Sequence, residues 1–172
     1  MDLIKDLAQK LTKNMAELLE RCNEFANMAE VEIAKRPIHR VLVDIGALID
    51  LMSLDAYRQF SFGDDVLKPK GTSIHGFSGA SAKTKGSIEL MVTIGEEPCQ
   101  ATVKVKFMVV RSVVAFNAIL DRPTLTALRA IILPIHLKMK FPTENGIGKI
   151  RGDQKKAREC YVMFVKQNKG NI

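Results

Sequence analysis

Short segments rich in β-branched residues, separated by turn residues, recur along most of this sequence and constrain its fold more than any other feature. In one of them apolar and charged residues alternate as VKVKF, a period of two that places apolar side chains on one face of a strand. The chain is therefore predicted to be mainly β and mostly antiparallel. The expected strands are 40–43, 88–94, 101–110, 113–120, 131–132, 136–141 and 147–151, the last two joined through the hairpin signal at Asn145 and Gly146.

Helical patterns precede, interrupt and follow the strands. Apolar residues recur at steps of three and four over residues 1–36, which indicates amphipathic helix up to Pro37, where the missing backbone N–H ends it. Inside the β region, Ser53 is a candidate N-cap for one short helix, and Pro123 suits the first turn of another. Residues 153–166 are expected to form a short C-terminal helix.

The net charge of +7 is concentrated at the C-terminal end. Residues 1–36 carry 6 basic against 7 acidic residues, residues 37–137 carry 11 against 9, and residues 138–172 carry 9 against 3. No aromatic interleaving or nucleic-acid motif accompanies the basic residues, so a solvated basic face is the favoured interpretation. Nucleic-acid binding through this end is kept as the weaker alternative.

Composition excludes several other classes of protein. The chain has 172 residues and no apolar run near the roughly 20 residues that a membrane-spanning helix needs, so no membrane partner is expected. The first residues, MDLIKDLAQKLTKN, are too charged for a secretory signal, and a cytoplasmic location is expected. The three cysteines and three histidines are scattered, so we expect neither disulfides nor a metal site, and no cofactor.

The stretch VLVDIGALID raises the question of function. Asp44, Ile45 and Gly46 follow a β-branched apolar run, and such a triplet is most often a turn that ends a strand. The alternative is a carboxylate held for chemistry. Two later features bear on the choice: a Gly-rich hairpin over residues 70–94, and an apolar strand over residues 118–120 that leads directly into the helix at Pro123.

This order of features resembles the retropepsins, the aspartic proteases of retroviruses and of long-terminal-repeat retrotransposons. The segments GFSGASAKTKGSIELMVTIG and ILDRPTLTAL resemble most closely the Gag-Pol protease region of plant Gypsy-type elements. The resemblance implies a protease domain over residues 38–142, preceded by a Gag-like helical segment over 1–36. Residues 143–172 would be a basic hairpin and helix extending toward the reverse transcriptase region.

The resemblance implies a closed β-barrel protomer that works as a homodimer on an extended polypeptide, such as its own polyprotein. Asp44 and its symmetry mate would be the catalytic pair: two carboxyls that share one proton and activate a water against the peptide carbonyl. The Gly-rich hairpin would be the flap that closes over the substrate. Its expected substrate-binding residues are His75, Gly76, Phe77, Ser78 and Gly79.

Two positions that support the catalytic loop depart from the family. The family has Thr or Ser where this chain has Ile45, so the hydroxyl that bonds across the dimer axis is missing. The family has Gly where this chain has Asp121, which either points inward and crowds Asp44 or turns toward the N-terminus of the following helix. Impaired activity is therefore expected. The alternatives are a dimeric peptide-binding module without activity and a Gag-derived assembly or nucleic-acid-binding fragment.

Overall fold

The computed structural model describes residues 30–45, 48–69, 73–75, 81–111, 116–133 and 137–153, together with the single positions Lys155, Glu159 and Val162. The expected N-terminal helical segment lies outside the described residues, apart from its last few positions. The expected C-terminal helix also lies outside them, apart from those single positions.

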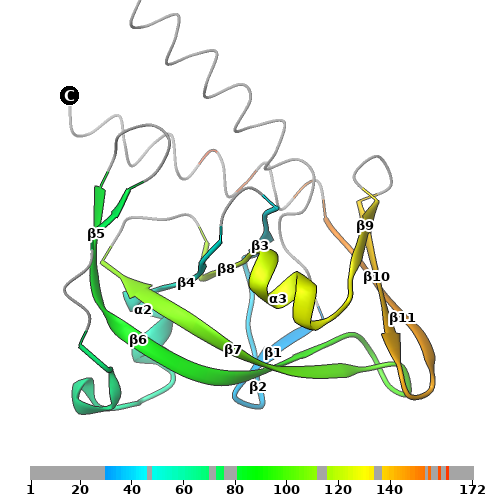
Figure 1. Ribbon diagram of the computed structural model, residues 1–172, viewed down its shortest axis with the longest axis horizontal. Coiled ribbons are helices and arrows are strands. Elements are labelled where there is room, and N and C mark those ends of the chain that lie inside the picture. The colour runs from blue at the N-terminus through cyan, green and yellow to red at the C-terminus, as the bar shows by residue number, and fades with distance from the viewer. Residues whose placement is uncertain are drawn as a thin grey trace, which may run out of the picture.

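Two long antiparallel strands, β6 (Ser81–Ile94) and β7 (Ala101–Val110), run across the middle of the molecule (Figure 1). Their register pairs Ile94 with Ala101 and continues to a bulge at Thr84 and Gly86. The strand expected over residues 101–110 is confirmed, and β6 is longer than expected. The alternation VKVKF buries Val105 and Phe107 and exposes Lys104 and Lys106, as a period of two requires.

The strands of the main sheet follow the order β2, β1, β6, β7, β4, β8, β3. Strand β5 pairs with β6 outside this path. Most pairs are antiparallel, as predicted, but β3–β8 and β4–β7 are parallel. The sheet curls into a half-barrel around its buried side (Figure 1), so the mainly β prediction is confirmed. Bounds of these strands are β1 Val31–Ile33, β2 Arg36–Pro37, β3 Val41–Val43, β4 Asp50–Ser53, β5 Ser73–His75 and β8 Ala118–Leu120.

The expectation of helix up to residue 36 is wrong at its end. Val31 and Ile33 are buried on either side of the exposed Glu32, and β1 pairs with both β2 and β6. The alternation Val-Glu-Ile suits a strand, and pairing on both edges outweighs the helical periodicity of the preceding residues. Strand pairing therefore starts before the expected domain boundary at residue 38.

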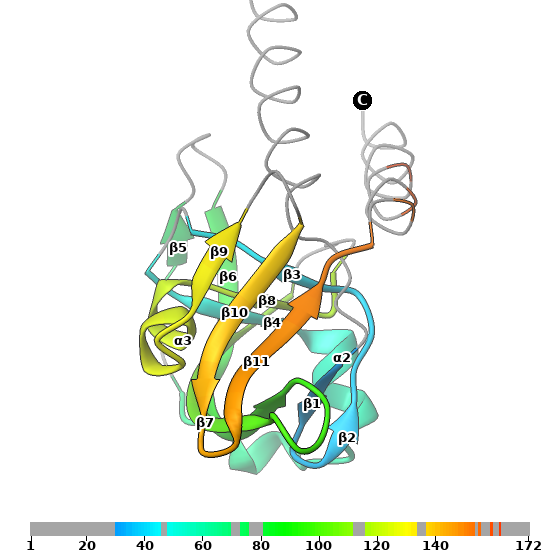
Figure 2. The same cartoon turned by 90° about the vertical axis from the view of Figure 1, so that its right-hand side faces the viewer.

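A second, three-stranded sheet packs beside the first and is seen face-on in Figure 2. It consists of β9 (Ile131–Leu133), β10 (Lys138–Thr143) and β11 (Gly146–Arg151). Thr143 pairs with Gly146 around a two-residue turn, so the predicted hairpin is present, with its turn at Glu144 and Asn145, one residue before the expected Asn-Gly pair. The expected boundary at residue 142 falls inside this hairpin, so β11 continues the sheet that contains β10.

Two short helices interrupt the strands at the predicted places. Helix α2 (Leu54–Gln59) is capped by Ser53, whose Oγ accepts the backbone N–H of Ala56 at 3.1 Å. Helix α3 (Arg122–Ala127) carries Pro123 in its first turn. A single 3₁₀ turn, η1 (Asp64–Val66), follows α2. Among the described residues, no helix has the length and apolar character needed to cross a lipid bilayer.

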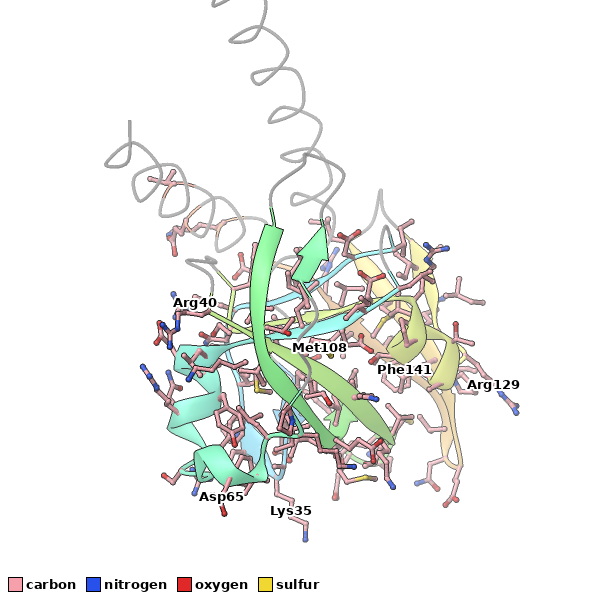
Figure 3. All side chains as sticks on the ribbon, turned by 60° about the vertical axis from the view of Figure 1, so that its left-hand side comes forward. Lys35, Arg40, Asp65, Met108, Arg129 and Phe141 are labelled. Atoms are coloured by element: carbon pink, nitrogen blue, oxygen red, sulfur yellow. The ribbon has the colours of Figure 1, made fainter. Side chains whose placement is uncertain are left out.

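The hydrophobic core lies between the curled sheet, α2 and the three-stranded sheet. Its fully buried large side chains come from both sheets and from α2, which ties the short strands to the long hairpin. In Figure 3 the side chains of Met108 and Phe141 lie among the strands, while Lys35 and Arg129 point away from the body of the molecule. The largest members are Tyr57, Phe107, Phe141, Ile33, Met52, Ile94, Leu120 and Met139.

Candidate active site

The loop that carries Asp44 begins and ends beside one end of β8. Strand β8 lies between β3, to which it is parallel, and β4, to which it is antiparallel. The chain leaves β3 at Asp44 and enters β4 at Asp50, on either side of the end of β8 at Leu120. This arrangement places Asp44 beside the residue that follows β8, which is Asp121.

A single peptide group holds both ends of this loop. The carbonyl oxygen of Leu120 accepts the backbone N–H of Asp44 at 2.9 Å. The N–H of the same peptide group, on Asp121, donates to Oδ1 of Asp50 at 2.6 Å. In a trans peptide the C=O and N–H point in opposite directions, so one reaches toward β3 and the other toward β4. The loop of residues 44–50 is thus fastened to β8 at its start and at its end.

The predicted catalytic residues lie where solvent or a partner can reach them. Asp44 is half-buried, whereas the side chain of Ile45 is 54% exposed. Two further apolar side chains of the loop, Leu48 and Ile49, are 68% and 38% exposed. Gly46 lies outside the described residues. The loop that carries Asp44 therefore exposes three apolar side chains.

Asp121 caps helix α3 and is also buried. Its Oδ1 accepts the backbone N–H of Arg122 at 2.7 Å, and its residue is only 1% exposed. Of the two orientations considered from the sequence, the carboxylate does face the N-terminus of α3, but without reaching solvent. The carboxyl of Asp50, at the far end of the loop, interacts with that of Asp121, so the crowding involves a residue that sequence reasoning missed.

Asp50 is a buried carboxyl at the first position of β4. It is 2% exposed, and burial raises its pKa above the usual value; the neighbouring Asp121 carboxylate raises it further. The Asp121 N–H, which donates to this carboxyl, and the nearby Thr124 lower the pKa of Asp50. The Thr124 hydroxyl is itself buried and makes no hydrogen bond of acceptable length and angle within the described residues. An aspartate inside the apolar stretch LIDLM was the one available sequence signal for this site.

Solved structures with a similar fold include the three that follow. EIAV protease complexed with the inhibitor HBY-793 is 24% identical, with a TM-score of 0.45, over 64% of this chain and 94% of the other. A retropepsin-like aspartic protease from Rickettsia conorii is 16% identical, with a TM-score of 0.46, over 73% and 81%. The retroviral protease-like domain of Ddi1 from Leishmania major is 14% identical, with a TM-score of 0.51, over 72% and 93%.

The likeness to the Leishmania major domain, which spans nearly all of that domain, decides the architecture. The chain has a retropepsin-like fold. No protein-family model matches the sequence, and no curated protein does either. The expected fold is thus confirmed, with the difference that the described strands form a curled half-barrel rather than a closed barrel.

The expected flap of this retropepsin-like fold is only partly described. Strand β5 pairs antiparallel with the start of β6, with His75 opposite Ser81, so the two arms of a hairpin are present. The tip, which includes Gly76, Phe77, Ser78 and Gly79, lies outside the described residues. The hairpin arms rise on the same side of the molecule as the end of β3 (Figure 1).

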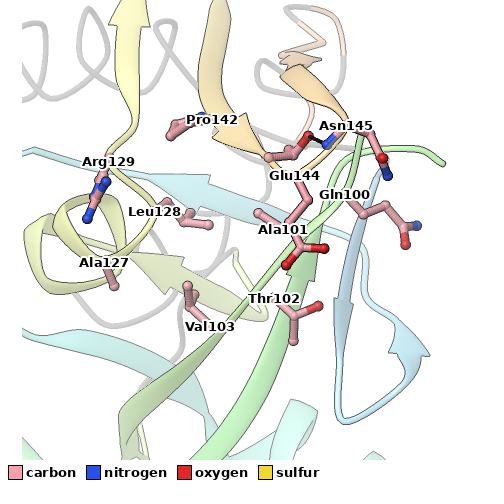
Figure 4. A pocket seen from close by; sticks show the side chains of 11 residues that line it. Gln100, Ala101, Thr102, Val103, Ala127, Leu128, Arg129, Pro142, Glu144 and Asn145 are labelled. Carbon is pink, nitrogen blue, oxygen red and sulfur yellow. Dashed lines mark hydrogen bonds between the residues drawn. The ribbon is translucent and has the colours of Figure 1, made fainter. Parts of the chain in front are cut away.

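A separate groove lies away from the Asp44 loop. It has a volume of about 660 Å³ and lies between the start of β7, the end of α3 and the β10–β11 turn (Figure 4). Its walls mix apolar residues such as Leu128 and Pro142 with polar ones such as Arg129 and Glu144. None of the predicted site residues lines it. Among the described residues, no group of three or more His, Cys, Asp or Glu side chains is placed to hold a metal ion.

Proposed function

We propose that this chain is the protomer of a homodimeric aspartic endopeptidase of the retropepsin type, with Asp44 as the catalytic residue and with weakened activity. The observation that carries the proposal is the position of Asp44. It directly follows β3, its backbone is fastened to Leu120 of β8, and its loop leaves the sheet at the half-exposed Ile45. The plant Gypsy-type origin is proposed on the sequence resemblance alone.

Each protomer supplies one such loop, so a complete site needs two chains. The apolar side chains of Ile45, Leu48 and Ile49 support this arrangement, because exposed apolar groups next to a carboxylate suit contact with a partner loop or an extended peptide. In the dimer, Asp44 and its mate would share one proton. The ionised carboxyl would take a proton from water as the water attacks the peptide carbonyl, and the protonated carboxyl would donate to the carbonyl oxygen.

Weakened activity follows from the residues around this loop. Ile45 has no hydroxyl to bond across the dimer axis, and its exposed side chain brings branched apolar volume to that contact. Asp121 adds a buried carboxyl at the end of β8, next to Asp50. These features favour a second candidate function, in which the dimer binds extended peptides in the same cleft and flap without cleaving them.

A cleavage assay on an unstructured polypeptide in mildly acidic buffer tests the proposal. The matched control is Asp44→Asn, which removes the ionisable carboxyl and keeps its shape. We expect slow cleavage that is absent from the control and that rises with the square of protein concentration while monomer dominates. Cleavage that persists in the control, or that is first order in protein, would contradict the proposal.

The second candidate is separated from the first by inhibitor binding. A statine-type peptide carries a hydroxyl in place of the attacked carbonyl and would contact both aspartates of a dimer. Binding that depends on Asp44, without turnover of any peptide in a mixed library, would identify the binding module. The absence of both binding and turnover would reject both functions.

A further inference from the structure

The far end of the Asp44 loop is held by a side chain rather than by the backbone. At the near end, two backbone groups meet: Asp44 N–H and Leu120 C=O. At the far end, the N–H of the same Leu120–Asp121 peptide is satisfied by the carboxyl of Asp50. A backbone bond keeps the same strength across the pH range, whereas ionisation of a buried carboxyl strengthens the bond it accepts but makes its burial costlier, and burial is the larger effect at Asp50. The two ends of the loop should therefore respond differently to pH.

The surroundings of Asp50 make its ionised form costly. The residue is 2% exposed, and Asp121 is the charged group that acts on its carboxyl among the described residues. Lys106, on the adjacent strand β7, and Arg122, at the start of α3, both have exposed side chains. A second ionised carboxyl in this buried position is repelled by the first and loses its hydration.

We propose that Asp50 is a positioning residue that ties the far end of the Asp44 loop to the Leu120–Asp121 peptide, and that it holds this end most firmly in acid. Opening the far end exposes Asp50 to water, where its ionised form is hydrated. Below the ordinary carboxyl pKa, Asp50 is protonated in both the closed and the open loop, and the free-energy difference that favours the closed loop is at its largest. Because the pKa of Asp50 is raised in the closed loop, this free-energy difference decreases as the pH rises toward and through the raised value.

The consequence for catalysis rests on the proposed function, but the pH-dependent bond between Asp50 and the Asp121 N–H, called the latch below, does not. If Asp44 is catalytic, its loop is most ordered under the acidic conditions in which a carboxyl pair shares a proton. If the chain has no activity, Asp50 still controls how often the bond between its carboxyl and the Asp121 N–H opens. Amide hydrogen exchange measures that opening directly, so the failure of either idea can be recognised without the other.

The experiment compares amide exchange at Asp121 and around Val92 by NMR from acidic to neutral pH, corrected for the intrinsic rates of the unfolded chain. The first site lies at the latch, and the second lies in the long β6–β7 hairpin. We expect protection at Asp121 to fall as the pH rises, by about tenfold for each unit by which the pKa of Asp50 exceeds its ordinary value. Protection around Val92 should stay constant.

Two substitutions at the latch and one elsewhere make the assignment specific. Asp50→Asn keeps an Oδ1 acceptor without a charge, so protection at Asp121 should become independent of pH. Asp50→Ala removes the acceptor, so exchange at Asp121 should rise by about tenfold or more at every pH. Asp65→Asn removes the same charge from an exposed residue and should keep the normal pH dependence.

Three results would overturn the proposal. Protection at Asp121 that does not change with pH in the unmodified chain would show that Asp50 exerts no such control. Equal changes at Asp121 and around Val92 would show a general loss of stability rather than a local latch. A pH dependence retained by Asp50→Asn would assign the effect to another group. If Asp50→Ala does not fold, the unmodified chain and Asp50→Asn still decide.

Discussion

Replacement of Ile45 by Thr separates dimer contact from protomer stability. The side chain of Ile45 is 54% exposed, so a little under half of it is buried within the protomer. The change replaces an ethyl group by a hydroxyl and removes two carbons, each worth about 0.8 kcal/mol when fully buried. Scaled by the buried fraction, the loss is about 0.7 kcal/mol. The free energy of unfolding of the protomer should therefore fall by less than about 1 kcal/mol.

The same substitution should strengthen the dimer. A threonine hydroxyl at this position would bond across the two-fold axis, and each buried hydrogen bond restored there is worth about 1–3 kcal/mol. Symmetry doubles the effect to about 2–6 kcal/mol, which lowers the dimer dissociation constant by at least about 30-fold. Sedimentation equilibrium measures that constant, and urea unfolding at low protein concentration measures protomer stability.

A matched control is available in the same loop. Ile49→Thr makes the same chemical change at a residue that is 38% exposed, but the proposed dimer contact does not require a hydroxyl there. We expect it to leave the dissociation constant unchanged or to raise it. If Ile45→Thr changes dimerisation by less than a few-fold, or if Ile49→Thr tightens the dimer equally, Ile45 does not occupy the proposed axial position.

Two other predictions follow from the site and its supports. The double variant Ile45→Thr, Asp121→Gly should gain more peptidase activity than the two single variants together, because both positions support one loop. The gain should vanish when Asp44→Asn is added. Glycine at the N-cap of α3 should lower the free energy of unfolding by only a few tenths of a kcal/mol. A folded double variant that dimerises and cleaves nothing would place the defect elsewhere. Ser53→Ala should lower the free energy of unfolding by about 1 kcal/mol, because the Ala56 N–H loses its acceptor. Denaturant titration measures this change, and an unchanged value would show that water replaces the cap.

Local patterns predicted those elements whose stability depends on near neighbours. The alternation in residues 101–110 gave β7 its bounds, and Ser53 and Pro123 marked the starts of α2 and α3. The hairpin at residues 143–146 followed from its turn residues. Each of these signals is complete within about ten residues, so the rest of the chain does not have to be known.

Features that depend on distant contacts were missed or misjudged. Strand β1 follows a segment with helical periodicity, and its place in the main sheet depends on pairing with β6, more than 50 residues later, as well as with β2. Asp50 was overlooked because its apolar neighbours in LIDLM do not reveal what a buried carboxyl there would bind; its partner peptide lies 71 residues further along the chain. The placement of Asp121 likewise needed the structure, since helix capping and burial beside Asp50 are both compatible with the sequence ILDRP.

The insertion of β8 between β3 and β4 also affects how the domain folds. The β6–β7 hairpin closes a short loop and can form early, whereas β3 and β4 gain their common neighbour only when residues 118–120 join them. Long loops cost more entropy to close, and contacts that are distant in sequence slow folding. Asp44 is synthesised early, but the peptide group that fastens its loop comes more than 70 residues later. A growing chain that ends before residue 121 should therefore hold the carboxylate without its support, and the proposed peptidase activity should not appear before that peptide group is in place.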